Sequence, residues 1–196
     1  MKQILFCLLL LLAISEARAA SYAPREGDLV FQSLPHNSLV DAIEGVSNSR
    51  LSHCGIVVKL DDKWYVLEAI GKVIYTPLAK WESRGRKRAF SVSRFNAHTA
   101  IDIPKFIEAA KAYLGKDYDF HYAFDNDEIY CSELPFLAYK AVTGKPLGQV
   151  RKLGEMNWKP HEAFIRSVEN GNLPLERPMI TPVDLSKASE LETIYK

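Results

Sequence analysis

Residues 53–70, HCGIVVKLDDKWYVLEAI, decide the fold. Two apolar runs, 53–60 and 64–70, flank a short polar stretch and predict a β-hairpin. Directly opposed residues of an antiparallel pair share a sheet face, and each strand alternates between faces. The number of residues in the turn therefore determines which side chains lie together.

The candidate registers of this hairpin differ in where they place Glu68. A three-residue turn puts Glu68 on an otherwise aliphatic face, where an unpaired carboxylate is costly to bury. A turn of two or four residues puts Glu68 opposite Gly55 and diagonal to His53, within reach of that histidine. We predict the even turn. The aliphatic face then holds Cys54, Ile56, Val58, Leu60, Tyr65, Leu67 and Ala69.

Cys131 is the candidate nucleophile. A helix is expected from about Cys131 to Thr143, ended by Gly144, so the thiol lies at a helix N-terminus. That position lowers the pKa of a thiol and supplies N–H groups for an oxyanion. Taken singly, this cysteine, His53 and Glu68 each have an ordinary packing interpretation. Together they predict nucleophilic attack on an acyl carbon.

A disulfide is the alternative for the same cysteine. Apart from Cys7 near the N-terminus, the chain contains only Cys54 and Cys131, and exported proteins commonly form disulfides. Cys54 follows His53 in the strand, so the two side chains point to opposite faces. We therefore expect Cys131 to meet either His53 or Cys54, but not both.

The first 19 residues predict a signal peptide. Lys2 precedes an apolar run over residues 4–14, and Ala17-Arg18-Ala19 offers small residues to a signal peptidase. The run is shorter than the about 20 residues that span a bilayer. We expect cleavage near Ala19, a periplasmic or secreted protein, and a single domain over residues 20–196; an uncleaved anchor is the alternative.

The remaining patterns predict an α+β fold with an antiparallel sheet. Strands gather in the middle of the chain, helices flank them, and the connections are mostly too short for parallel crossovers. The tail after Asn170 is expected to be irregular, on the surface or along a groove. The other expected elements are a strand within 27–31, a helix capped by Ser38, a strand over 89–95, a helix from Asp102 and Pro104 to Gly115, and a helix over 160–168.

Charge and composition limit the partners. The formal net charge is +1, so no nucleic acid is expected. The five histidines are scattered and no cysteine pair has zinc spacing, so no metal and no cofactor is implied. The basic run at 84–88, RGRKR, indicates either a solvated loop or contact with an anionic envelope surface such as lipid headgroups.

Five segments, in this order, carry a family resemblance: GDLVF at 27–31, SHCGIV at 52–57, VLEA at 66–69, LGKDYDF at 114–120 and YCSE at 130–133. They resemble the NlpC/P60 superfamily of papain-like cysteine hydrolases, in its circularly permuted YaeF/YiiX branch. The histidine strand precedes the cysteine, which is the permuted order. The resemblance implies a papain-like fold whose small sheet packs against the nucleophile helix.

The same resemblance implies roles for the site residues. Cys131 would be the nucleophile, His53 the general base and acid, and Glu68 the third member, which favours catalysis over the disulfide. Tyr118 falls where the family has a tyrosine close to the site, so it either contacts substrate or packs. The asparagine-cysteine motif of the lecithin:retinol acyltransferase-like relatives does not occur, so transfer to retinol-type acceptors is not supported.

The substrate follows only from export and the resemblance. Together they imply first the cleavage of an amide or ester bond in cell-wall (peptidoglycan) peptides. The second alternative is a lipid or N-acyl substrate, on which the protein would act as a hydrolase or as an acyltransferase. A non-catalytic peptide- or lipid-binding protein with a Cys54–Cys131 disulfide is the third alternative.

Overall fold

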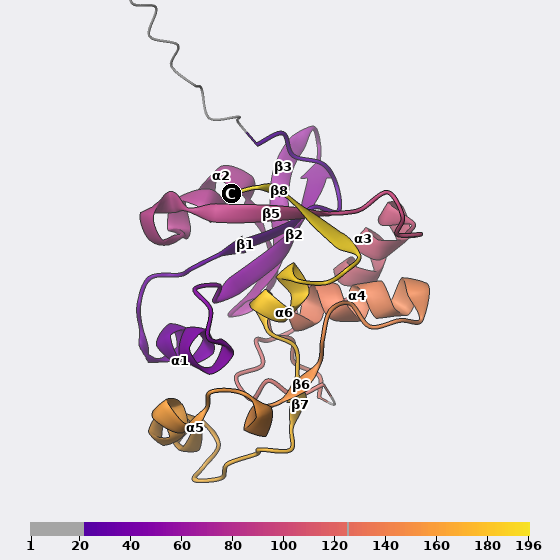
Figure 1. Ribbon diagram of the computed structural model, residues 1–196. Helices are drawn as coiled ribbons and strands as arrows, with labels where there is room; N and C mark the ends of the chain where they lie inside the picture. Colours follow the sequence, from indigo (N-terminus) through magenta and orange to yellow (C-terminus); the bar gives the residue numbers. More distant parts are fainter. Residues whose placement is uncertain (1–21, 125) are drawn as a thin grey trace, which may run out of the picture.

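An antiparallel sheet of six strands forms the centre of the computed structural model, which describes residues 22–124 and 126–196. The predicted signal peptide lies outside the described residues. The strand order is β4-β3-β2-β1-β5-β8 (Figure 1), and the expected α+β class is confirmed. The strands are β1 (Leu29–Gln32), β2 (His53–Leu60), β3 (Lys63–Ile70), β4 (Lys72–Pro77), β5 (Phe90–Phe95) and β8 (Leu191–Tyr195).

The β2–β3 hairpin has the even turn. Leu60 pairs with Lys63, so only Asp61 and Asp62 form the turn, both at positive φ (46° and 60°). Two such residues are typical of the type I′ turn, whose twist matches that of the strands. Ile56 pairs with Leu67, and the same register continued by one residue places Gly55 opposite Glu68. The prediction from hydrophobic patterning is confirmed.

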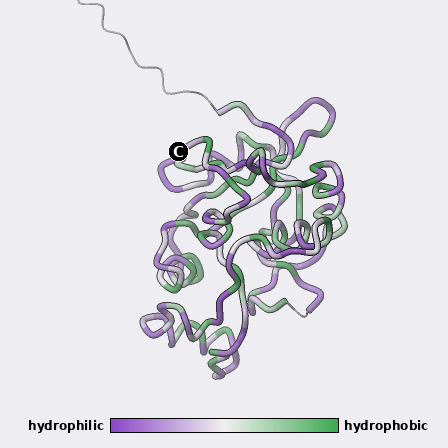
Figure 2. Tube along the Cα trace, turned by 45° about the vertical axis from the view of Figure 1, so that its right-hand side comes forward, coloured by the Kyte–Doolittle hydropathy of each residue, from purple (hydrophilic) through white to green (hydrophobic). Residues whose placement is uncertain are grey.

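Helices cover both faces of the sheet (Figure 1). On one face, α3 (Ile103–Lys111) and α4 (Glu133–Thr143) pack against the aliphatic side chains of β1, β2 and β3. On the other face, α2 (Leu78–Arg84) buries Trp81 against Val57 and Val66. Figure 2 shows hydrophobic residues recurring along the strands and the helices that cover them. The strands β1, β2 and β3 therefore supply alternate side chains to two separate cores.

Three helix boundaries differ from those expected. The first helix, α1 (Ser38–Ser47), is capped by Asn37, whose side chain accepts from the N–H of Val40, and not by Ser38. Asp102 caps α3 as expected, but the helix ends at Lys111 and turns occupy the residues up to Gly115. Helix α4 begins at Glu133, two residues after Cys131. The cysteine therefore precedes the helix instead of lying within it.

The tail after Asn170 was expected to be irregular, and that part of the expectation is wrong. It forms β7 (Pro178–Met179), which pairs with β6 (Arg151–Lys152), then α6 (Pro182–Ser186), and finally β8 against β5. Proline spacing suggested irregular chain, yet Pro182 occupies the first turn of a helix, where proline is tolerated. As an edge strand of largely exposed side chains, β8 lacks the alternation that marks a strand.

The expected helix over 160–168 consists of a short 3-10 turn (Lys159–His161) followed by α5 (Glu162–Val168). Helix α5, β6 and β7 lie together at one end of the molecule, below α1 in Figure 1. Among the described residues, no helix combines the length and apolar character that crossing a membrane requires.

Glu133 gives a pH-dependent test of this packing. It is 1% exposed and accepts a hydrogen bond from the N–H of Tyr130 at 3.2 Å. Burial raises its pKa from 4.5 to about 8. The unfolded chain releases this proton at lower pH than the folded protein, so stability falls as pH rises between these two values.

We predict that Glu133→Gln is more stable than wild type, with a difference in Tm that grows from about pH 5 to about pH 8 and then levels off. Thermal unfolding followed by circular dichroism measures this difference. The exposed Glu192→Gln is the matched control and should show no such trend. A Tm difference that does not depend on pH would contradict the assignment.

Candidate active site

His53 and Glu68 form a buried pair. His53 is the first residue of β2, and the hairpin register brings Glu68 of β3 to the same sheet face. The imidazole Nε2 lies 2.5 Å from Glu68 Oε2. The two residues are 2% and 0% exposed. Water therefore does not screen the interaction, which is stronger than a surface ion pair.

Glu68 has two further partners. The hydroxyl of Thr76 on β4 donates to Glu68 Oε1 at 2.5 Å, and the guanidinium of Arg84 on α2 donates to Oε2. Burial by itself would raise the pKa of Glu68, but the hydrogen bonds from His53 and Arg84 lower it to about 2. The carboxylate is thus ionised at neutral pH, and its negative charge stabilises the protonated form of the His53 imidazole.

Cys131 lies next to the His53 side of the His53–Glu68 pair. It directly precedes Ser132, the N-cap of α4, and its Sγ lies 3.9 Å from the carbonyl oxygen of Ser52. Hydrogen bonds from the Cys54 thiol, from His53 and from the Cys54 N–H lower the pKa of the Cys131 thiol well below its ordinary value, although burial opposes them. These partners therefore favour the thiolate form of Cys131.

The pKa of His53 shifts upward, in the opposite direction to that of Cys131. Burial by itself would lower the pKa of His53, but its hydrogen bonds with Cys131 and Glu68 raise it to about 9. Cys131 and His53 thus titrate as a coupled pair. The two shifts, down for the thiol and up for the imidazole, favour a thiolate beside an imidazolium over a neutral pair, the arrangement that activates a cysteine for nucleophilic attack.

We expected Cys131 to meet only one of His53 and Cys54, and that expectation is wrong. Cys54 Sγ lies 3.4 Å from the carbonyl oxygen of Cys131, and the two cysteines do not form a disulfide. His53 and Cys54 do point to opposite faces, but they begin the strand. Cys131 lies against that strand end, next to Ser52, where a side chain reaches neighbours from both faces.

Tyr118 is buried beside the same sulfur. It is 8% exposed, belongs to the core cluster around α3 and α4, and its hydroxyl lies 3.1 Å from that of Tyr122. Burial and the nearby Tyr122 and Cys131 raise the pKa of Tyr118 well above its ordinary value. It therefore remains a neutral phenol that packs in the core and can donate a hydrogen bond toward the site.

Sequence reasoning missed Thr76 and Arg84. Both lie on elements, β4 and α2, that were not predicted. Arg84 is the first residue of the basic run at 84–88, which was interpreted as a single exposed feature. The charge of Glu68 was the available signal, because a fully buried carboxylate requires a cationic partner.

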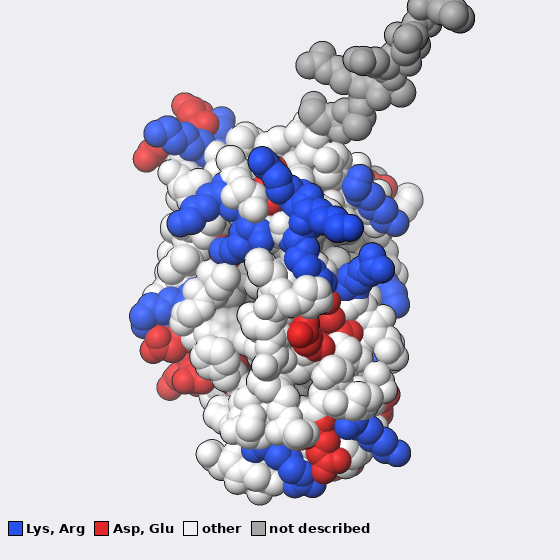
Figure 3. Space-filling model, turned by 90° about the vertical axis from the view of Figure 1, so that its left-hand side faces the viewer, with Lys and Arg blue, Asp and Glu red and all other residues white. Residues whose placement is uncertain are grey.

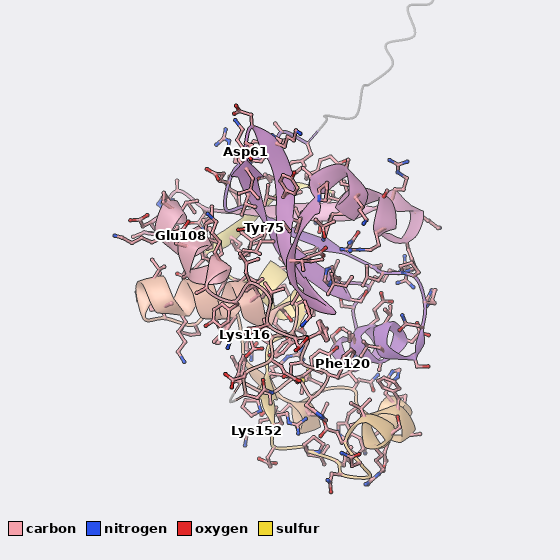
Figure 4. All side chains as sticks on the ribbon, turned by 180° about the vertical axis from the view of Figure 1, so that it is seen from behind. Asp61, Tyr75, Glu108, Lys116, Phe120 and Lys152 are labelled. Atoms are coloured by element: carbon pink, nitrogen blue, oxygen red, sulfur yellow. The ribbon has the colours of Figure 1, made fainter. Side chains whose placement is uncertain are left out.

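An apolar hollow leads to Cys131. It encloses about 720 Å³ of empty space, counting its open mouth, between α1 and the C-terminal segments. Figure 4 shows Asp61 at the tip of the β2–β3 hairpin and Phe120 toward the opposite end, nearer α1 and α5. The lining is largely aliphatic and aromatic, and it includes Leu39, Ala42, Ile43, Val46, Phe120, Phe164, Ile165 and Val168 together with Cys131 and Ser132.

Charged groups in the hollow neutralise one another. Arg177 makes two hydrogen bonds to the carboxylate of Glu169, which His121 also approaches at 3.3 Å.

Across residues 22–124 and 126–196, no three His, Cys, Asp or Glu side chains are grouped so that they could hold a metal ion.

Comparisons with known proteins place this arrangement in a family. Residues 23–195 match the family described as "permuted papain-like amidase enzyme, YaeF/YiiX, C92 family". The uncharacterized protein YiiX of Escherichia coli (strain K12) is 33% identical over 192 residues, which cover 96% of this chain and 95% of that protein.

A solved structure agrees. The crystal structure titled metalloprotein yiiX from Escherichia coli O157:H7 superposes with a TM-score of 0.83 at 34% identity, covering 89% of this chain and 98% of that one. The fold is therefore papain-like with a permuted chain order. The chain belongs to the YaeF/YiiX (C92) family of permuted papain-like amidases and is a cysteine hydrolase of the peptidase or amidase type.

Proposed function

We propose that the protein hydrolyses an amide bond through Cys131, His53 and Glu68. The Cys131 thiolate attacks the carbonyl carbon, and the first N–H groups of α4, unpaired within the helix, stabilise the oxyanion. The His53 imidazolium gives its proton to the leaving amine and then, as a base, takes one from the water that releases the acyl group. Glu68, held by Arg84 and Thr76, orients the imidazole.

We further propose that the acyl group is apolar. The observation that carries this proposal is the aliphatic and aromatic lining of the hollow, to which Cys131 also belongs. Each methylene that leaves water for such a surface contributes about 0.8 kcal/mol. An N-acyl substrate with an extended hydrocarbon chain fits this lining.

Cell-wall peptides, which the sequence placed first, fit the hollow less well. Such peptides carry ammonium and carboxylate groups, and burial of an unpaired charge is costly. The charged lining residues Arg177 and Glu169 already satisfy one another. We therefore place the lipid-type acyl amide first and the cell-wall amide second. Export of the protein is likewise a proposal, which rests on the sequence of residues 1–19.

Thiol labelling tests the activated nucleophile. Between about pH 6 and about pH 8, the rate of alkylation of an ordinary thiol rises on the order of 100-fold, because the thiolate fraction rises. We predict that the rate at which iodoacetamide modifies Cys131 changes less than about threefold over this range, since its pKa is already low. Peptide mapping by mass spectrometry distinguishes Cys131 from Cys54.

His53→Gln is the control for this experiment: it removes one of the groups that lower the pKa of Cys131, so it should make the pH dependence at Cys131 steeper than in wild type. Cys54 is an internal reference, because burial and the neighbouring Cys131 raise its pKa well above the ordinary value. An ordinary pH dependence for wild-type Cys131 would refute the proposed thiolate.

A chain-length series tests the substrate. With N-acyl amino acids of about two to about sixteen acyl carbons, kcat/KM is predicted to rise about fourfold per methylene until the hollow is filled. Ile43→Trp narrows the hollow and should end this rise at a shorter chain, without changing the rate for the shortest acyl group.

Two controls accompany the series. Ile194→Trp makes the same change at an exposed position of β8 and should behave like wild type, and Cys131→Ala should be inactive. Cleavage of muropeptides in preference to every acyl substrate would reverse the assigned order of substrates.

A further inference from the structure

A second hollow lies on the His53 side of the sheet and is distinct from the one that reaches Cys131. It encloses about 1190 Å³ of empty space, counting its open mouth, and we call it the basic groove. Gln32 of β1 lies in it, directly opposite His53 in the sheet. Neither His53 nor Cys131 lines it, so the proposed hydrolysis does not use it. Its charged and polar lining is Gln32, Ser33, His36, Glu44, Arg50, Arg86, Lys87, Ser91 and Lys196.

The groove has an excess of positive charge. If Lys196 is not counted, the lining contains three cationic side chains and one carboxylate. The cations are Arg50, Arg86 and Lys87, and the carboxylate is Glu44. Arg86 binds this carboxylate, but within residues 22–124 and 126–196 the side chains of Arg50 and Lys87 form no ion pair. Figure 3 shows Lys and Arg side chains gathered over the upper half of this side of the molecule. The groove therefore attracts anions.

Gln32 points to a ligand in the groove. It is 1% exposed, yet neither its amide nitrogen nor its amide oxygen has a hydrogen-bond partner among the described residues. Buried polar groups are normally paired, and an unpaired one costs about 1–3 kcal/mol. A Cβ at Gly85 would lie 2.5 Å from Gln32 Oε1, so the glycine leaves room for this amide. A ligand oxygen can accept from the amide nitrogen.

The loop that supplies two of the cations is held in place. Arg86 donates to Ser33 Oγ at 2.8 Å and to Glu44 Oε1 at 2.6 Å, which fixes its guanidinium between β1 and α1. Lys87 and Arg88 both have positive φ (56°), a conformation that costs a non-glycine residue free energy. The cations are therefore presented by a constrained backbone and not by a free loop.

We propose that the basic groove is a binding site for a phosphate-type oxyanion. Arg50 and Lys87 supply charge, and the Gln32 amide nitrogen supplies a neutral donor. The ligand is either a free phosphate group or the phosphate of a lipid headgroup. This inference does not depend on the proposed hydrolysis.

Binding of two probes to the full chain tests the site at constant ionic strength. Inorganic phosphate is titrated while the side-chain NH₂ signal of Gln32 is followed by NMR. Vesicles of phosphatidylglycerol, and of phosphatidylcholine as a zwitterionic phosphate, are tested by co-sedimentation. A saturable shift of the Gln32 signal with inorganic phosphate indicates the free anion, and binding to vesicles alone indicates the headgroup.

Three variants separate the groove from general surface charge. R50E/K87E should weaken binding at least tenfold, whereas K140E/K145E makes the same charge change at exposed positions in and after α4 and should have little effect. Gln32→Leu should also weaken binding at least tenfold while leaving Tm unchanged or higher, because it removes an unpaired buried amide. Normal binding by Gln32→Leu, equal losses in both charge-reversal variants, or no binding of either probe by wild type would each overturn the proposal.

Discussion

The carboxylate of Glu68 is the constraint on which the rest of the site depends. It is fully buried, and an unpaired charge in that position would be too costly for the fold to retain. Its partners come from three different elements: His53 begins β2, Thr76 lies on β4 and Arg84 ends α2. The carboxylate therefore fixes the helix and the strands around it and sets the charge of the histidine.

The positively charged His53 imidazole in turn lowers the pKa of the Cys131 thiol. Cys131, the proposed nucleophile, comes from the opposite side of the sheet, just before α4, and meets His53 at the end of β2. Side chains from the two faces of a sheet can approach one another where a strand begins or ends. Helix α1 separates the two hollows next to this point: Leu39 and Ile43 line the apolar hollow, whereas Glu44 lines the basic groove.

The sequence predicted well whatever depends on local periodicity. Alternation in β2 and β3 and the cost of burying Glu68 were enough to set the hairpin register, and the approach of His53 to Glu68 followed. Features made by distant pairing were not predictable. Strand β8 has few buried side chains, and β4 and α2 contribute Thr76 and Arg84 only through their place in the fold. The contact of Cys131 with both Cys54 and His53 depends on where the strand ends, which alternation does not specify.

The protonation state of His53 tests the central claim most directly. NMR of the isotope-labelled imidazole gives its pKa in the resting protein. The buried carboxylate and the Cys131 thiolate require a value of about 9, with a protonated ring throughout neutral pH. The Cys131→Ala variant should lower that value, because one of its two hydrogen-bond partners is lost. A wild-type value at or below the ordinary 6.5 would contradict the proposed ion pair and the mechanism that depends on it.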